Sequence, residues 1–202
     1  MRGQVKNFVR GDFGQREQLI GLWGIEHGCG VTHMALAIAT YVKTMWKCKV
    51  AYVAYHAHFT VGKIAFLNQK QGDYFVYHGI DCYHGMSKEQ LLERCNRKYE
   101  YIILDFGILR SQPDDMVKMC NQRFILACSA EWRIGYFYEW LKGKNKEEMR
   151  TYKFLLPFAN RTCLDDFMHE YDFDFISIPY QQSPFSLNPA MLVLLNDLIE
   201  GE

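Results

Sequence analysis

A glycine-rich segment near the start of the chain has the residue types that could hold a phosphate. An apolar run at 18–24 (QLIGLWG) leads into the turn 24–30 (GIEHGCG), and apolar residues then recur at helical spacing over 32–46. A strand, a tight glycine turn and a helix direct backbone N–H groups and the positive end of the helix toward one point. We expect this turn to be either a phosphate cradle or a purely structural connection.

The turn lacks the cation that phosphate-binding loops use. Such loops end in G-K-[S/T], where the lysine reaches the phosphates and the hydroxyl holds Mg²⁺. Here Val31 stands at the lysine position and Thr32 at the hydroxyl position. Protonated His27 or His33 would replace part of the missing charge, and the alternative is that both are simply solvated at the start of the helix. Cys29 is a candidate nucleophile because a helix N-terminus lowers the pKa of a thiol, but the sequence offers it no identifiable base.

Strand and helix patterns alternate along the rest of the chain. Strands are predicted at 18–24, 49–55, 74–77, 99–105, 123–128, 152–158 and 174–178, and helices at 32–46, 61–69, from Ser87, 113–121, 134–142 and 189–199. Residues 143–150 are predicted to be an exposed turn or the start of a solvated helix.

This alternation predicts the fold class. The run at 99–105 is apolar without alternation, which is typical of a parallel strand covered on both faces. We therefore expect an α/β fold with an open, mostly parallel sheet and helices on both faces. No linker rich in Pro, Gly or Ser divides the sequence, so residues 1–202 are predicted to form one domain, with 1–16 as an N-terminal arm.

The predicted sheet indicates where a ligand would bind. Open parallel sheets bind ligands beyond the carboxyl ends of their strands. In this chain that edge carries the segments 24–33, 54–60 and 105–113. Asp105, at the end of a strand, is a candidate magnesium ligand or alternatively a cap.

These motifs resemble the ParA/MinD family of deviant Walker ATPases, which includes the TadZ/CpaE-type proteins of pilus assembly. The family's loop reads K-G-G-x-G-K-[S/T]-[S/T]. Against it, Glu26 takes the place of the signature lysine and Val31 that of the Walker lysine, while Gly28, Gly30 and Thr32 are kept. The resemblance implies a P-loop NTPase-like, three-layer fold.

The resemblance extends along most of the chain. Residues 35–39 are similar to the family's first helix, and 49–53 to its second strand, whose D-x-D segment falls on 54–56 without either aspartate. Residues 101–105 resemble the Walker B strand with Asp105 kept, and Asn160 matches the asparagine that reads adenine. The nucleotide-binding candidates are thus His27, Gly28, Cys29, Gly30, Val31, Thr32, His33, Asp105 and Asn160.

The missing charges argue against catalysis. Phosphoryl transfer depends on positioning and on charge stabilisation, and two lysines and the aspartates are absent here. The preferred hypothesis is a non-catalytic ParA/MinD-like scaffold or positioning subunit in a bacterial assembly, a homodimer by the resemblance. The alternative is a weak nucleotide-binding switch or ATPase with ATP or ADP and Mg²⁺ as cofactor. An unrelated α/β enzyme lacks a complete set of catalytic groups.

Aromatic residues suggest a surface for protein partners. Five of them lie within 132–140, on both sides of one predicted helix, and Trp132, Tyr136 and Trp140 are the candidate partner-binding residues. The proline-containing stretch 179–189 is a second unusual segment, a loop that either packs over the sheet edge or serves a partner.

Composition limits the remaining classes. Lys+Arg and Asp+Glu both number 23, so the net charge of zero gives no reason to expect a nucleic-acid partner. Seven scattered cysteines without a C-x-x-C pair are typical of a reduced, cytoplasmic protein. No metal site is expected, because the pair His56 and His58 has no third ligand nearby, and no apolar run is long enough to span a membrane.

Overall fold

The computed structural model describes residues 17–55, 70–71, 74–95, 98–108 and 115–200. Within these residues nine strands form one sheet in the order β3-β4-β5-β2-β6-β1-β7-β8-β9. The strands are β1 (Gln18–Gly24), β2 (Val50–Ala54), β3 (Lys70–Gln71), β4 (Tyr74–Tyr77), β5 (Ile80–His84), β6 (Tyr101–Ile108), β7 (Gln122–Leu126), β8 (Lys153–Pro157) and β9 (Asp174–Ile178).

Strands from β5 to β9 in this order pair in parallel, and the β3–β4 and β4–β5 pairs at one edge are antiparallel. The prediction of an open, mostly parallel sheet is therefore confirmed. The helices are α1 (Val31–Met45), α3 (Lys88–Cys95), α4 (Asp115–Met119), α5 (Ile134–Leu141), α6 (Lys146–Met149), α7 (Arg161–Glu170) and α8 (Pro189–Glu200).

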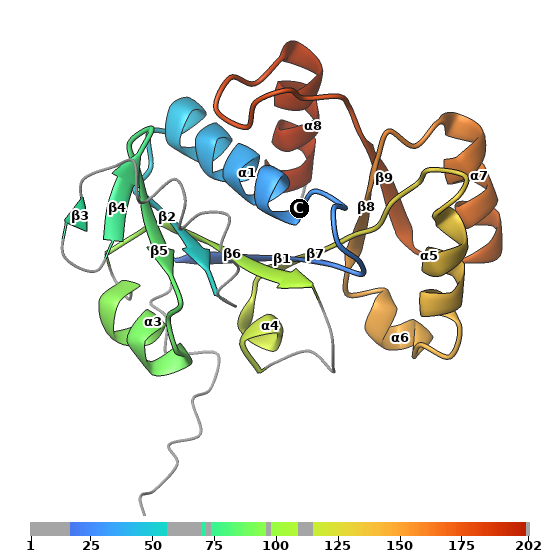
Figure 1. The fold of residues 1–202 in the computed structure, drawn as a ribbon, viewed down its shortest axis with the longest axis horizontal. Coiled ribbons are helices and arrows are strands. Elements are labelled where there is room, and N and C mark those ends of the chain that lie inside the picture. Colours follow the sequence, from blue (N-terminus) through green and yellow to red (C-terminus); the bar gives the residue numbers. More distant parts are fainter. Residues whose placement is uncertain (1–16, 56–69, 72–73, 96–97, 109–114, 201–202) are drawn as a thin grey trace, which may run out of the picture.

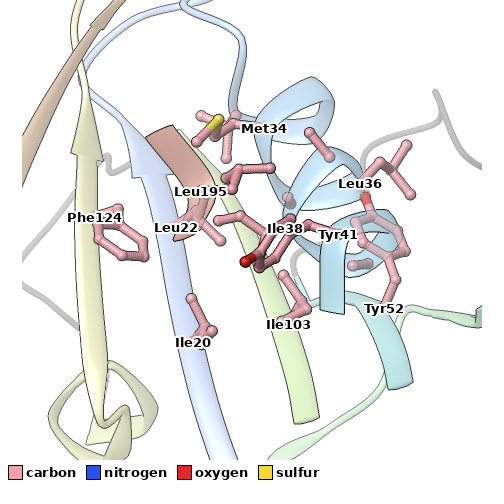
Figure 2. Close-up of a cluster of buried hydrophobic side chains, with 14 of the residues drawn as sticks. Ile20, Leu22, Met34, Leu36, Ile38, Tyr41, Tyr52, Ile103, Phe124 and Leu195 are labelled. Atoms are coloured by element: carbon pink, nitrogen blue, oxygen red, sulfur yellow. The ribbon is translucent and has the colours of Figure 1, made fainter. Parts of the chain in front are cut away.

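Helices cover both faces of the sheet, as predicted (Figure 1). On one face α1 and α8 pack over a core that includes Ile20, Ile38 and Leu195 (Figure 2). On the other face residues of α3, α4, α5, α6 and α7 form a second core, in which Phe137 and Phe167 are fully buried. The central strands are apolar toward both sides because both sides are covered.

Three elements were not predicted from the sequence: the two-residue strand β3, the strand β5 and the helix α7. β5 follows β4 through a tight turn in which His78 and Gly79 both have positive φ, of 49° and 73°, as a type I′ hairpin requires. α7 begins after Asn160, whose side chain accepts a hydrogen bond from the Cys163 N–H and so caps the helix.

The remaining expectations agree with the structure in outline. Ser87, where a helix was predicted to begin, forms a capping box with Gln90, with hydrogen bonds in both directions. The stretch 143–150 contains the short helix α6. The predicted helix 61–69, the arm 1–16 and the His56/His58 pair lie outside the described residues.

Candidate functional site at the glycine loop

The sheet order brings the glycine loop and Asp105 together. β6 lies between β1 and β2, so the ends of these three strands meet at one edge. In the register of β1 and β6, Leu22 pairs with Asp105 and Gly24 with Ile108, so β6 carries one extra residue at this point. Thr32 lies at the start of α1, and its Oγ1 donates a hydrogen bond of 2.6 Å to Asp105 Oδ2.

The loop 25–30 takes its shape from glycines. Gly28 and Gly30 have φ of 81° and 94°, a conformation that glycine adopts without steric cost. A Cβ at Gly24 would overlap the Sγ of Cys29 and lie 2.9 Å from Val31 Cγ2. Gly30 is the N-cap of α1, and no side chain caps that helix. The first turn of α1 therefore keeps the positive partial charge of an open helix N-terminus.

Asp105 is held by hydrogen bonds from three different parts of the chain. Its carboxylate is 5% exposed and accepts three hydrogen bonds. Besides the Thr32 bond, the Tyr52 hydroxyl donates to Oδ2 at 2.7 Å and the Gly107 N–H donates to Oδ1 at 2.9 Å. Burial and the Asp105 charge raise the pKa of Tyr52 well above its usual value, so this phenol remains a donor.

Two pockets adjoin the loop. The first has a volume of about 470 Å³ and is lined by residues 26–33 with Gly107 and Ile108. The second, of about 240 Å³, shares loop residues with the first, and its further lining is mostly apolar: Met34, Leu126, Pro157, Phe158, Ile178, Pro179, Gln181 and Met191. A pocket of mixed polar and apolar lining and a mainly apolar pocket thus share Gly28–Gly30.

A salt bridge closes one side of the loop. Arg133, just before α5, donates to Glu26 Oε2 from Nε at 3.1 Å and from Nη2 at 2.7 Å. The same Nη2 donates to the His27 carbonyl at 2.7 Å. The Glu26 Oε1 atom is buried and has no hydrogen-bond partner. The sequence could not indicate this pair, because 107 positions separate the two residues.

Comparison with solved structures identifies this arrangement. MinD, a cell division protein of Aquifex aeolicus, superposes with a TM-score of 0.63 at 14% identity, over 92% of this chain and 98% of that one. A putative plasmid partition protein of Borrelia burgdorferi B31, solved with AMPPNP bound, has a TM-score of 0.59 at 14% identity, with the same coverage of both chains. The chain has the ParA/MinD fold.

The resemblance seen in the sequence is therefore confirmed at the level of the fold. MinD in the MinC:MinD complex of Aquifex aeolicus also matches, with a TM-score of 0.54 at 12% identity and 82% of each chain covered. No protein-family profile matches the sequence, and no curated protein is significantly similar to it.

Two positions that hold lysines in the ParA/MinD loop are occupied by Glu26 and Val31 in this chain. The two side chains have different surroundings. Glu26 holds Arg133 at the rim, as described above. Val31 is buried and belongs to the core between α1 and the sheet. Position 31 nevertheless lines the first pocket, so an apolar side chain there leaves the loop without the cation that the lysine supplies in the ParA/MinD loop.

The two candidate histidines of the loop differ in their surroundings. Burial lowers the pKa of His33, and its Nε2 is buried without a hydrogen-bond partner, so this imidazole is neutral at pH 7. His27 has an exposed side chain, and only its carbonyl takes part in the Arg133 contact. A neutral His33 does not supply the missing positive charge, and the cation found at the loop is Arg133, which the sequence did not reveal.

Cys29 is not an activated nucleophile. Its side chain is 3% exposed and is directed toward Gly24, and its Sγ donates to the Glu26 carbonyl at 3.1 Å. Burial raises the pKa of this thiol to about 11, although the helix N-terminus nearby favours a lower value. The thiol fills the inside of the loop, where it supports the turn.

Asn160, the candidate adenine-reading residue, caps α7 through its Oδ1, which accepts from Cys163 N at 2.8 Å. It is not among the residues that line the two pockets, although Pro157 and Phe158 of the same segment line the second one. Its contact with a base stays a prediction.

The three candidate partner residues differ in their exposure to solvent. Trp132 is 83% exposed and Tyr136 is 67% exposed. Trp140 is half-buried, stacks on Phe137 and lies under the Nζ of Lys144. Two of the three thus present aromatic surface to solvent, next to Arg133 in the sequence.

The part of the chain that the structure describes holds no cluster of three His, Cys, Asp or Glu side chains able to bind a metal. Among its helices, none has both the length and the apolar character needed to cross a membrane.

Proposed function

We propose that this chain is a non-catalytic ParA/MinD-like domain that acts through protein contacts, as a scaffold or positioning subunit. The observation that carries the proposal is the Glu26–Arg133 salt bridge at the glycine loop. It puts a carboxylate beside the space that phosphates occupy in a P-loop, and it engages the guanidinium that could otherwise bind them.

Electrostatics supports this proposal. An unpaired carboxylate about 4 Å from a phosphate charge would cost on the order of 4 kcal/mol at an effective dielectric constant of about 20. Arg133 offsets this repulsion at Glu26, and the pair leaves the loop without a net positive charge. Transfer of a phosphoryl group requires the opposite arrangement, in which cations stabilise the charge of the transition state. Because Val31 provides no cation and Arg133 is paired with Glu26, the loop offers little more than backbone N–H groups.

The exposed aromatic residues favour protein contacts as the mode of action. Trp132 and Tyr136 present large apolar areas to solvent, and such residues are enriched in the energetically important centres of interfaces. MinD of Aquifex aeolicus, which shares this fold, forms a complex with MinC. A partner of this chain is proposed to bind over the surface formed by Trp132 and Tyr136. A homodimer stays a prediction from the resemblance.

Thermal unfolding with ATP or ADP, each with and without Mg²⁺, tests the proposal. A ligand at 100 times its Kd stabilises the native state by about 2.7 kcal/mol, which is a shift of about 5–10 °C for this size of domain. We expect no shift for the wild type. The double variant Glu26→Gln, Val31→Lys serves as the matched control, because it restores the charges of a P-loop on the same backbone.

A specific observation favours one alternative. The Thr32–Asp105 hydrogen bond of 2.6 Å joins the loop to β6. A pocket of mixed lining and a mainly apolar pocket also meet at the loop, as a weak nucleotide-binding switch would require. A shift of the wild type with ATP or ADP that is lost in Thr32→Ala would establish the switch and refute the non-catalytic scaffold.

A further inference from the structure

The hydrogen bonds of Asp105 leave little capacity for a metal ion. A carboxylate has about four acceptor positions on its two oxygens. Two hydroxyls, from Thr32 and Tyr52, occupy Oδ2, and the Gly107 N–H occupies one position on Oδ1. The group is buried, so solvent does not compete for these positions. Three of the four positions are therefore filled by the protein itself.

A magnesium ion, which the fold implies together with nucleotide, does not fit these residues. Mg²⁺ requires near-octahedral oxygen ligands at about 2.0–2.1 Å and keeps several waters, which donate to nearby carboxylates. Oδ2 of Asp105 already accepts two donors. The adjacent end of β2 provides no second carboxylate, because Ala54 pairs with Asp105 in the register and Tyr55 follows it.

We propose that the Tyr52 hydroxyl replaces the metal ion of the Walker site, so that Thr32, Tyr52 and Asp105 form a metal-independent clamp between α1 and the sheet. Tyr52 is a fully buried residue of β2 in the core on the α1 side of the sheet (Figure 2). Its hydroxyl donates to Asp105 Oδ2 at 2.7 Å. A hydrogen bond from a neutral hydroxyl to a carboxylate is a strong, charge-assisted one. The open N-terminus of α1 adds favourable partial charge near the same carboxylate.

Tyr52 is a positioning residue, because it acts on the loop through Asp105. The clamp is formed at the same site on which the proposed function rests, but a different ligand tests it. It concerns the divalent cation alone, whereas the proposed function concerns nucleotide. A protein that bound nucleotide without any metal would refute the proposed function and leave the clamp intact.

The test measures Mn²⁺ binding by electron paramagnetic resonance of the free ion, together with melting temperatures in EDTA and in millimolar Mg²⁺ or Mn²⁺. The variants are Tyr52→Phe and Asp105→Asn, and Tyr41→Phe is the matched control. Tyr41 is also a buried tyrosine of the α1-side core, and its hydroxyl donates to Asn196 Oδ1 at 3.0 Å, away from Asp105.

The clamp predicts that wild type and Tyr41→Phe bind no Mn²⁺ and melt at the same temperature with and without the metal. Tyr52→Phe is expected to melt roughly 2–4 °C lower in EDTA and to gain Mn²⁺ binding that Asp105→Asn removes. Mn²⁺ binding by the wild type that Asp105→Asn abolishes would overturn the inference, and this measurement needs no folded Tyr52 variant. A Tyr52→Phe protein as indifferent to Mn²⁺ as Tyr41→Phe would overturn it as well.

Discussion

The Nη2 of Arg133 lies 2.7 Å from both the Glu26 Oε2 and the His27 carbonyl oxygen, and it thereby joins the start of α5 to the glycine loop. Trp132, the neighbour of Arg133 in the sequence, is exposed on the surface proposed for partners. One short segment thus contacts the candidate ligand site with one residue and solvent with the next. While this salt bridge is intact, the positive charge of Arg133 is neutralised by Glu26 at the loop.

Removing the carboxylate of Glu26 should open the loop to anions. In Glu26→Gln the Arg133 guanidinium loses its charged partner and becomes available to an anion in the adjoining pocket. We expect pyrophosphate to bind at least about tenfold more tightly than to the wild type, measured by calorimetry without metal. The gain should vanish when Arg133→Gln is added.

Glu139→Gln is the matched control, because Glu139 is an exposed glutamate of α5 whose partner is Lys142. It should leave pyrophosphate binding unchanged. Equal affinity of the wild type and Glu26→Gln would show that the salt bridge does not limit access to the loop.

Gly24 should tolerate no side chain while Cys29 is present. The Cβ of Gly24→Ala would overlap the Cys29 Sγ and also approach Val31. We expect a loss of about 1–3 kcal/mol in the free energy of unfolding, measured in urea. Cys29→Ala should recover part of this loss in the double variant, because the two changes share one contact. Strictly additive effects would argue against the contact.

Buried thiols predict a loss of stability at alkaline pH. Burial raises the pKa of Cys29 to about 11 and that of Cys82 and Cys120 to about 12, from an ordinary 9.0. Below pH 9 these thiols are protonated in both states, so they add no pH dependence. Above pH 9 only the unfolded thiols release protons, so stability falls as pH rises toward the folded values, by about 1.4 kcal/mol per pH unit for each thiol.

Urea unfolding at several pH values between 8 and about 10.5 measures this slope. Cys120→Ala should reduce the slope by the share of one thiol, even though it also lowers stability at pH 8. An unchanged slope in this variant would mean that the Cys120 thiol titrates alike in both states.

The exposed aromatic residues should contribute little to stability. Trp132→Ala and Tyr136→Ala are expected to change the free energy of unfolding by less than about 0.5 kcal/mol, because both side chains lie in solvent. Phe137→Ala, in the same helix, should cost about 3–5 kcal/mol, because its ring packs against Phe154 and Phe167 in the core. Strong destabilisation by Trp132→Ala would mean that this residue supports the fold and is not reserved for a partner.

Much of the fold could be predicted from local patterns. The strand 174–178 and the helix starting at Pro189 have the predicted limits or nearly so, since apolar runs and a proline at the first turn are local signals. β5 was missed because Asp81 and His84 interrupt its apolar pattern. α7 was missed because Asn160, an N-cap, was assigned to ligand binding, and few of its residues are buried.

The sequence by itself determined the alternation of strands and helices, the glycine turn and the absence of both lysines, because propensity and residue identity are local properties. Only the tertiary structure decided that Arg133 reaches Glu26 and that Tyr52 reaches Asp105. These contacts join residues 107 and 53 positions apart. They form because the parallel sheet brings the ends of separate strands to one edge, and burial there requires each polar group to find a partner.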